Sequence, residues 1–135
     1  MRRLLVLAAA TPLLLSGTAS AATPSSPHRA PAPDRAFMLA VADDNQDLLT
    51  GRYAVLQCDP PGGTHRKGTK SCEALEKARG NPAAIARDRN RSCTTEYKPV
   101  KAFAVGTWDG ENIIFEHTYG NFCAMLAATG PLFDF

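Results

Sequence analysis

Four cysteines are the residues whose type and spacing point most directly to chemistry: Cys58, Cys72, Cys93 and Cys123. None of them forms a C-x-x-C pair, and no histidine stands at ligand spacing from a cysteine, which argues against a zinc site. An even number of cysteines in an exported chain indicates disulfides, here two. Four cysteines allow three pairings, and the spacing alone does not select among them.

The histidines do not form a catalytic set with any nucleophile. Glu116 and His117 are adjacent in a segment with strand character, so their side chains should point to opposite faces of a sheet. His28 lies in a Pro-rich stretch, and His65 lies in the basic segment 64–70, which we expect to be a flexible, solvated loop. The sequence has no G-x-S-x-G elbow and no phosphate-binding glycine loop. We therefore expect no enzymatic activity, no cofactor and no metal.

The N-terminus has the pattern of a secretory signal peptide over residues 1–21. Two arginines precede an apolar run, residues 4–15, and Ala19-Ser20-Ala21 follows as a small-x-small cleavage site. The run is shorter than the ~20 residues that a membrane span requires. We expect an extracellular protein of about 114 residues, one domain in size, with no membrane attachment after cleavage. Without Arg2 and Arg3 the formal charge of +2 falls to zero, which is unsuited to nucleic-acid binding.

The predicted strands and helices begin after a Pro-rich arm, residues 22–35, which we expect to be disordered. The domain itself is expected over residues 36–135. Strands are predicted over residues 37–41 and 52–58 from their β-forming residues. A helix capped by Ser71 should face the core with Cys72 and Leu75 and end at Gly80. A short second helix, residues 82–87, and a short last strand, residues 132–135, complete the prediction.

The clearest pattern is a hairpin, with strands over residues 100–107 and 111–119 joined at Asp109-Gly110, a favoured type I′ turn. Counting from this turn places Trp108 opposite Glu111 and puts apolar side chains on both faces of the hairpin. The two helices can cover one face of the sheet. Since a large exposed apolar surface usually marks an interface, we expect a homodimer that packs through the other face.

The stretch between the helices and the hairpin, residues 91–100, is polar and has no helix or strand period. Thr94 and Thr95 are β-branched and favour extended backbone. Pro99 fixes its own φ and biases Lys98 toward an extended conformation. A protease binds its substrate as an extended strand, and an ordered one loses less entropy on binding. The pattern predicts an exposed, extended loop that is offered to a protease.

Cysteine placement and the segment C-T-T-E-Y-K-P-V (Cys93 to Val100) resemble the Streptomyces subtilisin inhibitor family of secreted serine-protease inhibitors. The V-x-x-W-D-G hairpin turn and the terminal Phe133-Asp134-Phe135 are similar as well, so that the resemblance spans about Phe37 to Phe135. It implies an α+β fold with a five-stranded antiparallel sheet and two short helices on one face. It also implies disulfides Cys58–Cys72 and Cys93–Cys123, and a homodimer.

The same resemblance implies a reactive bond two residues after the third cysteine, here Thr95–Glu96. The residues expected to contact the protease around this bond are Ser92, Cys93, Thr94, Tyr97 and Lys98. Thr95 departs from the family, whose members commonly carry Lys, Arg or Met at this position. We therefore expect weak inhibition of trypsin, and as targets subtilisin-like serine proteases or enzymes with small primary pockets. The alternative hypothesis is a secreted, non-inhibitory protein-binding module on the same scaffold.

Overall fold

A computed structural model describes residues 33–135, so the predicted signal peptide and most of the Pro-rich arm lie outside the described residues. Within them the chain forms a single sheet and two α-helices. The strands and helices are β1 (Arg35–Asp43), β2 (Arg52–Gln57), β3 (Gly62–Gly63), α1 (Gly68–Lys77), β4 (Val100–Trp108), β5 (Glu111–Tyr119) and α2 (Phe122–Thr129). Two 3₁₀ turns, η1 (Leu48–Thr50) and η2 (Pro82–Ala84), lie in the connections.

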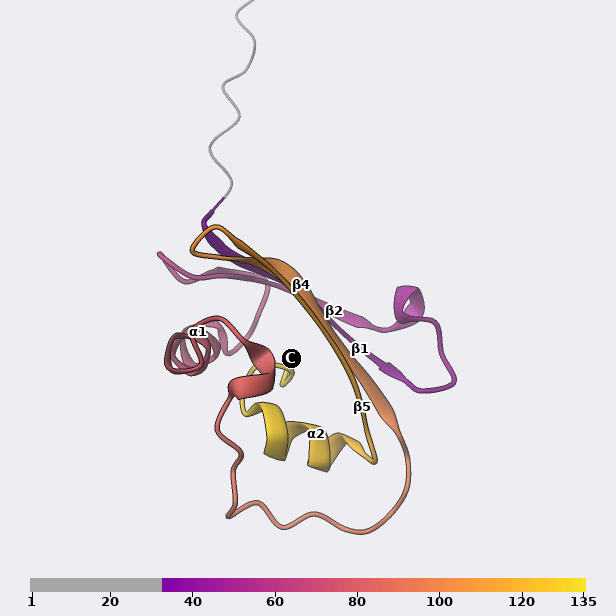
Figure 1. The fold of residues 1–135 in the computed structure, drawn as a ribbon. Coiled ribbons are helices and arrows are strands. Elements are labelled where there is room, and N and C mark those ends of the chain that lie inside the picture. Colours follow the sequence, from indigo (N-terminus) through magenta and orange to yellow (C-terminus); the bar gives the residue numbers. More distant parts are fainter. Residues whose placement is uncertain (1–32) are drawn as a thin grey trace, which may run out of the picture. The chain divides into compact units, whose positions relative to one another are not determined.

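The sheet has five strands in the order β3-β2-β1-β4-β5, and every neighbouring pair is antiparallel. Both helices lie on the same side of it (Figure 1). This arrangement confirms the predicted α+β class. Among residues 33–135 no helix has the length and apolar character needed to cross a membrane.

The hairpin has the predicted register. Trp108 pairs with Glu111, and the ladder then runs to Val100 opposite Tyr119. Asp109 and Gly110 have φ values of 51° and 84°, the two positive values that a type I′ turn requires. The turn therefore determines which side chains of β4 and β5 face the helices and which face away from them.

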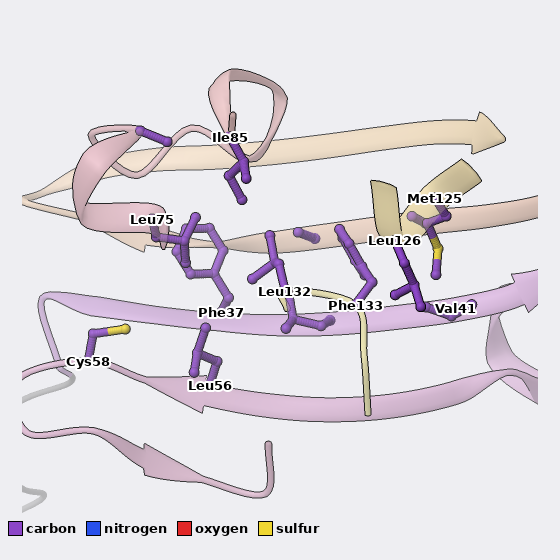
Figure 2. Packing of buried hydrophobic residues seen from close by; sticks show 14 of the residues in the cluster. Phe37, Val41, Leu56, Cys58, Leu75, Ile85, Met125, Leu126, Leu132 and Phe133 are labelled. Atoms are coloured by element: carbon purple, nitrogen blue, oxygen red, sulfur yellow. The ribbon is translucent and has the colours of Figure 1, made fainter. Parts of the chain in front are cut away.

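The core lies between the sheet and the helices (Figure 2). The most deeply buried large side chains come from β1, β2, α1, α2 and the C-terminal segment: Phe37, Leu39, Leu56, Leu75, Met125, Leu132 and Phe133. Phe133 stacks on Phe115 of β5 with ring centroids 5.9 Å apart. The C-terminal segment thus fills the space beneath the sheet, and the predicted strand over residues 132–135 is wrong. The fifth strand is instead the short β3, which pairs with β2.

The two helices also differ from the predicted ones. Residues 82–87 form only the turn η2, which is capped by the Asn81 side chain accepting the Ala83 N–H. The second α-helix is α2, which sequence reasoning missed. The first helix begins at Gly68, so that Ser71 is not its N-cap but lies within it. Ser71 is buried, and its hydroxyl donates to the Pro131 carbonyl at 3.2 Å, which fastens the C-terminal segment to α1.

The segment around His65 is not the flexible loop that we predicted. His65 is only 7% exposed, and its Nε2 lies 2.9 Å from the Leu132 carbonyl oxygen. Its Nδ1 accepts the Lys67 N–H at 3.0 Å, which requires the proton to sit on Nε2. The ring therefore joins the start of α1 to the C-terminal segment, and residues 68–70 belong to the helix.

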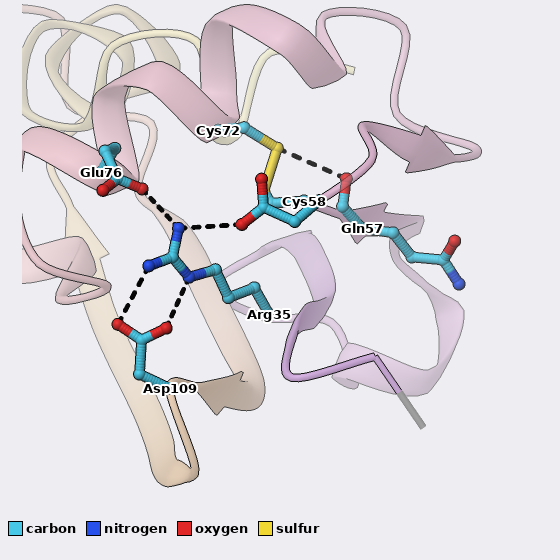
Figure 3. Close-up of polar contacts among 7 residues, drawn as sticks. Arg35, Gln57, Cys58, Cys72, Glu76 and Asp109 are labelled. Carbon is cyan, nitrogen blue, oxygen red and sulfur yellow. Dashed lines mark hydrogen bonds and ion pairs between the residues drawn. A yellow bond between two sulfur atoms is a disulfide. The ribbon is translucent and has the colours of Figure 1, made fainter. Parts of the chain in front are cut away.

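An ion-pair cluster around Arg35 of β1 links the hairpin turn to α1 and to the turn after β2 (Figure 3). The Arg35 guanidinium lies 2.6 Å from Asp109, 2.7 Å from Glu76 and 2.9 Å from Asp59. It also lies 4.5 Å from the centroid of the Trp108 ring. These contacts raise the pKa of Arg35 and lower that of Asp109, in both cases chiefly through the hydrogen bond between the two. The cluster is at the opposite end of β4 from the loop that precedes Val100.

Candidate functional site

The predicted loop is present and exposed. Residues 86–99 have no regular secondary structure, and they run past α2 to the start of β4 (Figure 1). Ser92, Thr94, Thr95, Glu96 and Lys98 are exposed, and Cys93 is half-buried. Tyr97 is 79% exposed, a larger exposed fraction than that of any other large aromatic side chain among the described residues. The side chains expected to meet a protease are therefore accessible to one.

Two disulfides have the pairing that the resemblance implied, Cys58–Cys72 and Cys93–Cys123. The second ties the loop, two residues before Thr95, to the first turn of α2. Its sequence separation is 30 residues, and it encloses the Thr95–Glu96 bond, β4 and β5. Closing a loop of that length stabilises a fold by about 3–4 kcal/mol in the chain-entropy description.

The side chain of Asn121 holds the loop on both sides of Thr95. Its Nδ2 donates to the Thr94 carbonyl oxygen at 3.2 Å and to the Glu96 carbonyl oxygen at 2.9 Å. Its Oδ1 accepts the Ala124 N–H at 2.8 Å and so caps α2. One amide group therefore fixes the backbone around the Thr95–Glu96 bond to the start of a buried helix.

The downstream end of the loop is fastened by backbone hydrogen bonds. The Lys98 N–H donates to the Gly120 carbonyl at 2.9 Å, and the Asp44 N–H donates to the Pro99 carbonyl at 3.1 Å. The loop is thus held at Cys93, at Thr94 and Glu96, and again at Lys98 and Pro99. Such closely spaced anchors restrict the motion that a peptide needs to pass through the steps of hydrolysis.

A cleft of about 520 Å³ lies beneath the loop. The loop contributes Thr94, Glu96 and Lys98 to its lining, and the connection between β1 and β2 contributes Gln46 and Thr50. Because this space is not filled by packed side chains, the position of the loop depends on the specific anchors rather than on a hydrophobic bed. Asn121 lines the same cleft, which places its amide where it can reach the loop.

Sequence reasoning missed Asn121, whose side chain donates two hydrogen bonds to the loop. A signal for it was present: an asparagine precedes F-C-A-M-L-A-A-T, a run rich in the helix formers Ala, Met and Leu, and Gly130-Pro131 follows. That is the pattern of a capped helix with a defined end. The histidines lie elsewhere, with His65 against Leu132 and the His117 ring 4.4 Å from that of Tyr119.

Comparisons with known proteins agree with this fold and site. Residues 34–121 match the subtilisin inhibitor-like family. The chain is 36% identical over 107 residues to subtilisin inhibitor-like protein 1 of Streptomyces cacaoi, covering 77% of this chain and 97% of that protein. It is 38% identical over 133 residues to a subtilase-type protease inhibitor of Streptomyces fradiae, covering 96% of this chain and 92% of that protein.

A solved structure is also similar, that of Streptomyces caespitosus sermetstatin in complex with Bacillus licheniformis subtilisin. The two chains are 27% identical and superpose with a TM-score of 0.60, covering 74% of this chain and 97% of the other. The match to the family covers more than half of the sequence. It includes the whole sheet, the loop, and three of the four cysteines, Cys58, Cys72 and Cys93. This chain therefore belongs to the subtilisin inhibitor-like family.

Proposed function

We propose that this protein is a secreted inhibitor of subtilisin-like serine endopeptidases and that its reactive bond is Thr95–Glu96. The observation that carries the proposal is the double hydrogen bond from Asn121 to the carbonyl groups on either side of Thr95. Thr95 itself stays exposed while the backbone on either side of it is fixed. The names of the relatives, which are protease inhibitors, support the same function.

The mechanism follows from what happens when a protease attacks this bond. The enzyme's serine adds to the Thr95 carbonyl, the bond to the Glu96 nitrogen breaks, and Thr95 becomes an acyl-enzyme ester. Asn121 and the Cys93–Cys123 bond keep the new Glu96 amine next to that ester. At the high effective concentration that results, the amine re-forms the peptide bond faster than water hydrolyses the ester.

Thr95 sets the class of enzyme. Its side chain has no charge to pair with the aspartate of a trypsin-type primary pocket, and it is too small to fill a deep apolar one. Subtilisin-like proteases and enzymes with small primary pockets fit it better. Ser92, Thr94, Tyr97 and Lys98 would supply the remaining contacts, and Tyr97 is an aromatic side chain of the kind that often dominates an interface.

The outer face of the sheet, opposite the helices, is proposed as the surface of a homodimer. It carries a row of apolar side chains from four neighbouring strands: Val55, Met38, Val105 and Ile114. Ile114 is 75% exposed, Met38 52% and Val55 41%. A second copy that packs face to face would remove these side chains from water.

Secretion is proposed from the signal-peptide pattern of residues 1–21 and from the two disulfides, which form in oxidising compartments. Mass spectrometry of the protein recovered from the culture medium of its producing cells would give the N-terminus directly. A start near Ala22 is expected. Recovery of the intact N-terminus from the cell interior would contradict secretion.

The test of the function is a titration of subtilisin, trypsin, chymotrypsin and an elastase with the disulfide-bonded protein. Tight, stoichiometric inhibition of subtilisin is expected, with a slow single cut at Thr95–Glu96 found by mass spectrometry of the mixture. Inhibition with a cut elsewhere would reject the assigned bond. No inhibition of any of the four enzymes would reject the function and favour a protein-binding module.

A further inference from the structure

A run of alternating arginines lies upstream of the disulfide-closed loop, and the proposed inhibition does not use it. Arg87, Arg89 and Arg91 are exposed and belong to the irregular segment 86–99. Arginine is the side chain that a trypsin-type protease binds, through the aspartate of its primary pocket. Each of the three is therefore a possible substrate residue for an enzyme class that Thr95 does not suit.

The backbone is hydrogen-bonded to the body of the protein at Asp88, and the residues that follow it have fewer hydrogen bonds. The Asp88 N–H donates to the Ala127 carbonyl of α2 at 2.8 Å, which holds the Arg87–Asp88 bond against the body of the protein. The Arg91 guanidinium lies 3.8 Å from the Asp88 carboxylate, and their side chains are 38% and 46% exposed. An ion pair of that length and exposure contributes little to order.

Residues 89–92 have few backbone anchors. In this part of the described chain, their backbone makes one hydrogen bond, from the Asn90 N–H to Asp88 Oδ1 at 3.0 Å. The Cys123 sulfur lies 3.7 Å from the Ser92 carbonyl oxygen, but it is oxidised and has no proton to donate. The Arg89–Asn90 and Arg91–Ser92 bonds therefore lack the two-sided support that Asn121 gives to Thr95–Glu96.

The disulfides give a cut at Thr95–Glu96 and a cut in residues 89–92 different consequences. A cut at Thr95–Glu96 leaves its two fragments joined, because Cys93 is on one and Cys123 on the other. A cut between Arg89 and Ser92 leaves Cys58–Cys72 on the first fragment and Cys93–Cys123 on the second, with no covalent bond between them. The first fragment then holds β1, β2, β3 and α1, and the second holds β4, β5 and α2.

We propose that the segment Arg89–Ser92 is a cleavage site for trypsin-type serine proteases and that cleavage there inactivates the inhibitor. In that reaction one water molecule is consumed, the C–N bond after Arg89 or Arg91 breaks, and a carboxylate and a free amine form. The amine is not held beside the acyl-enzyme, so hydrolysis is completed. The inactivation rests on the proposed function, whereas the cleavage site does not.

Inactivation follows because the two fragments share one core and one sheet. After the cut only noncovalent contacts join them: the β1–β4 ladder, the shared core, and polar contacts such as Arg35–Asp109 and His65–Leu132. Their association is then bimolecular, so dilution separates them, whereas the intact chain is unaffected by dilution. Loss of the first fragment also removes β1, one of the two sheet partners of β4, and β4 follows directly on the downstream end of the loop.

The experiment treats the disulfide-bonded protein with a small amount of trypsin and follows fragments and subtilisin inhibition together. We expect two fragments that separate on a denaturing gel without reducing agent, with new N-termini at Asn90 or Ser92. Inhibition of subtilisin should fall as cleavage proceeds and should fall further on dilution. The variant R89Q/R91Q should be cut at least about tenfold more slowly and keep its inhibition.

The matched control is R66Q, which removes an exposed arginine from the turn before α1, where Lys67 and Gly68 are hydrogen-bonded to His65. It should be cut as fast as the parent protein. Trypsin fragments that stay joined until reduction, or a first cut that creates an N-terminus other than Asn90 or Ser92, would overturn the cleavage site. Cut protein that inhibits subtilisin as well as the intact chain after dilution would overturn the inactivation. If the uncut protein does not inhibit subtilisin, the proposed function fails while the fragment pattern still decides the cleavage site.

Discussion

The Asn121 side chain donates to the Glu96 carbonyl oxygen at 2.9 Å while it accepts the Ala124 N–H at 2.8 Å. The loop and the first turn of α2 are therefore held by opposite ends of one amide group. Since Met125 and Leu126 bury α2 in the core, the position of the loop depends on the packing of the whole domain. This connection and the Cys93–Cys123 bond together hold the loop above the cleft.

Replacing Asn121 by aspartate separates the two roles of this amide. The variant N121D keeps an oxygen to cap α2 but loses both donors to the loop. Two lost hydrogen bonds correspond to about 1–3 kcal/mol, so we expect subtilisin inhibition to weaken roughly five- to hundredfold. The loop should also be cut faster, while the melting temperature changes little. Unchanged inhibition constants in both N121D and N121A would show that these hydrogen bonds do not order the loop.

Removing the Cys93–Cys123 bond should convert the inhibitor into a substrate. In the variant C93S/C123S no disulfide joins the fragment that carries the new Glu96 amine to the fragment that ends at Thr95. Hydrolysis therefore competes with resealing. We expect transient inhibition that ends as the protein is consumed, measured by subtilisin activity over time. The variant C58S/C72S is the control, since its missing disulfide is of similar value to the fold but does not enclose the reactive bond. Equal behaviour of the two variants at a temperature where both are folded would count against the tether.

The Arg35–Asp109 pair should make stability depend on pH in acid (Figure 3). The hydrogen bond from Arg35 holds the pKa of Asp109 below its ordinary value. A carboxyl with a lowered folded pKa stabilises the protein fully above its unfolded pKa, about 3.9, and loses this contribution as the pH falls through the folded pKa. The variant D109N should therefore show a smaller loss of melting temperature below about pH 4 than the parent protein. The control E73Q, at an exposed position on α1, should keep the parent's acid profile, and an identical profile in D109N would refute the prediction.

The parts of the fold that the sequence predicted correctly depend on local signals. The Asp109-Gly110 turn fixes the register of β4 and β5 through the φ values that it requires, so the faces of both strands could be counted from it. The helix α2 was missed because it is short, almost wholly apolar and half-buried or buried along most of its length, which leaves little amphipathic period to read. Its cap, Asn121, was the remaining signal.

The parts that could not be predicted depend on partners far apart in the sequence. His65 is buried because Leu132 supplies a carbonyl 67 residues away, and Leu132 is core because the C-terminal segment packs beneath the sheet rather than joining its edge. Asn121 reaches Thr94 across 27 residues. The exposed loop and its cysteine anchors could be read from the sequence, whereas the hydrogen bonds that hold it could not.

The proposed homodimer would pack through the apolar outer face of the sheet, and I114K tests it. A lysine at this position, now 75% exposed in the single chain, would have to be buried in a face-to-face dimer without a partner for its charge. We expect the variant to be a monomer by sedimentation equilibrium at concentrations where the parent is a dimer. The control T69K introduces the same charge at an exposed position of α1, on the other side of the sheet, and should remain a dimer. A parent protein that is monomeric at high concentration would exclude the interface.

The substitution T95K tests whether Thr95 enters the primary pocket of the protease. A lysine there can pair with the aspartate of a trypsin-type pocket, and a desolvated charge pair contributes about 2–5 kcal/mol, so inhibition of trypsin should tighten roughly thirtyfold or more. The measurement should be made in the R89Q/R91Q background, because trypsin would otherwise cut the arginine run and destroy the inhibitor under study. T94K is the matched control, since it places the same charge one residue away on the same anchored loop and should bring no comparable gain. If T94K and T95K behave alike toward trypsin, the pocket is filled by another residue and the reactive bond lies elsewhere in the loop.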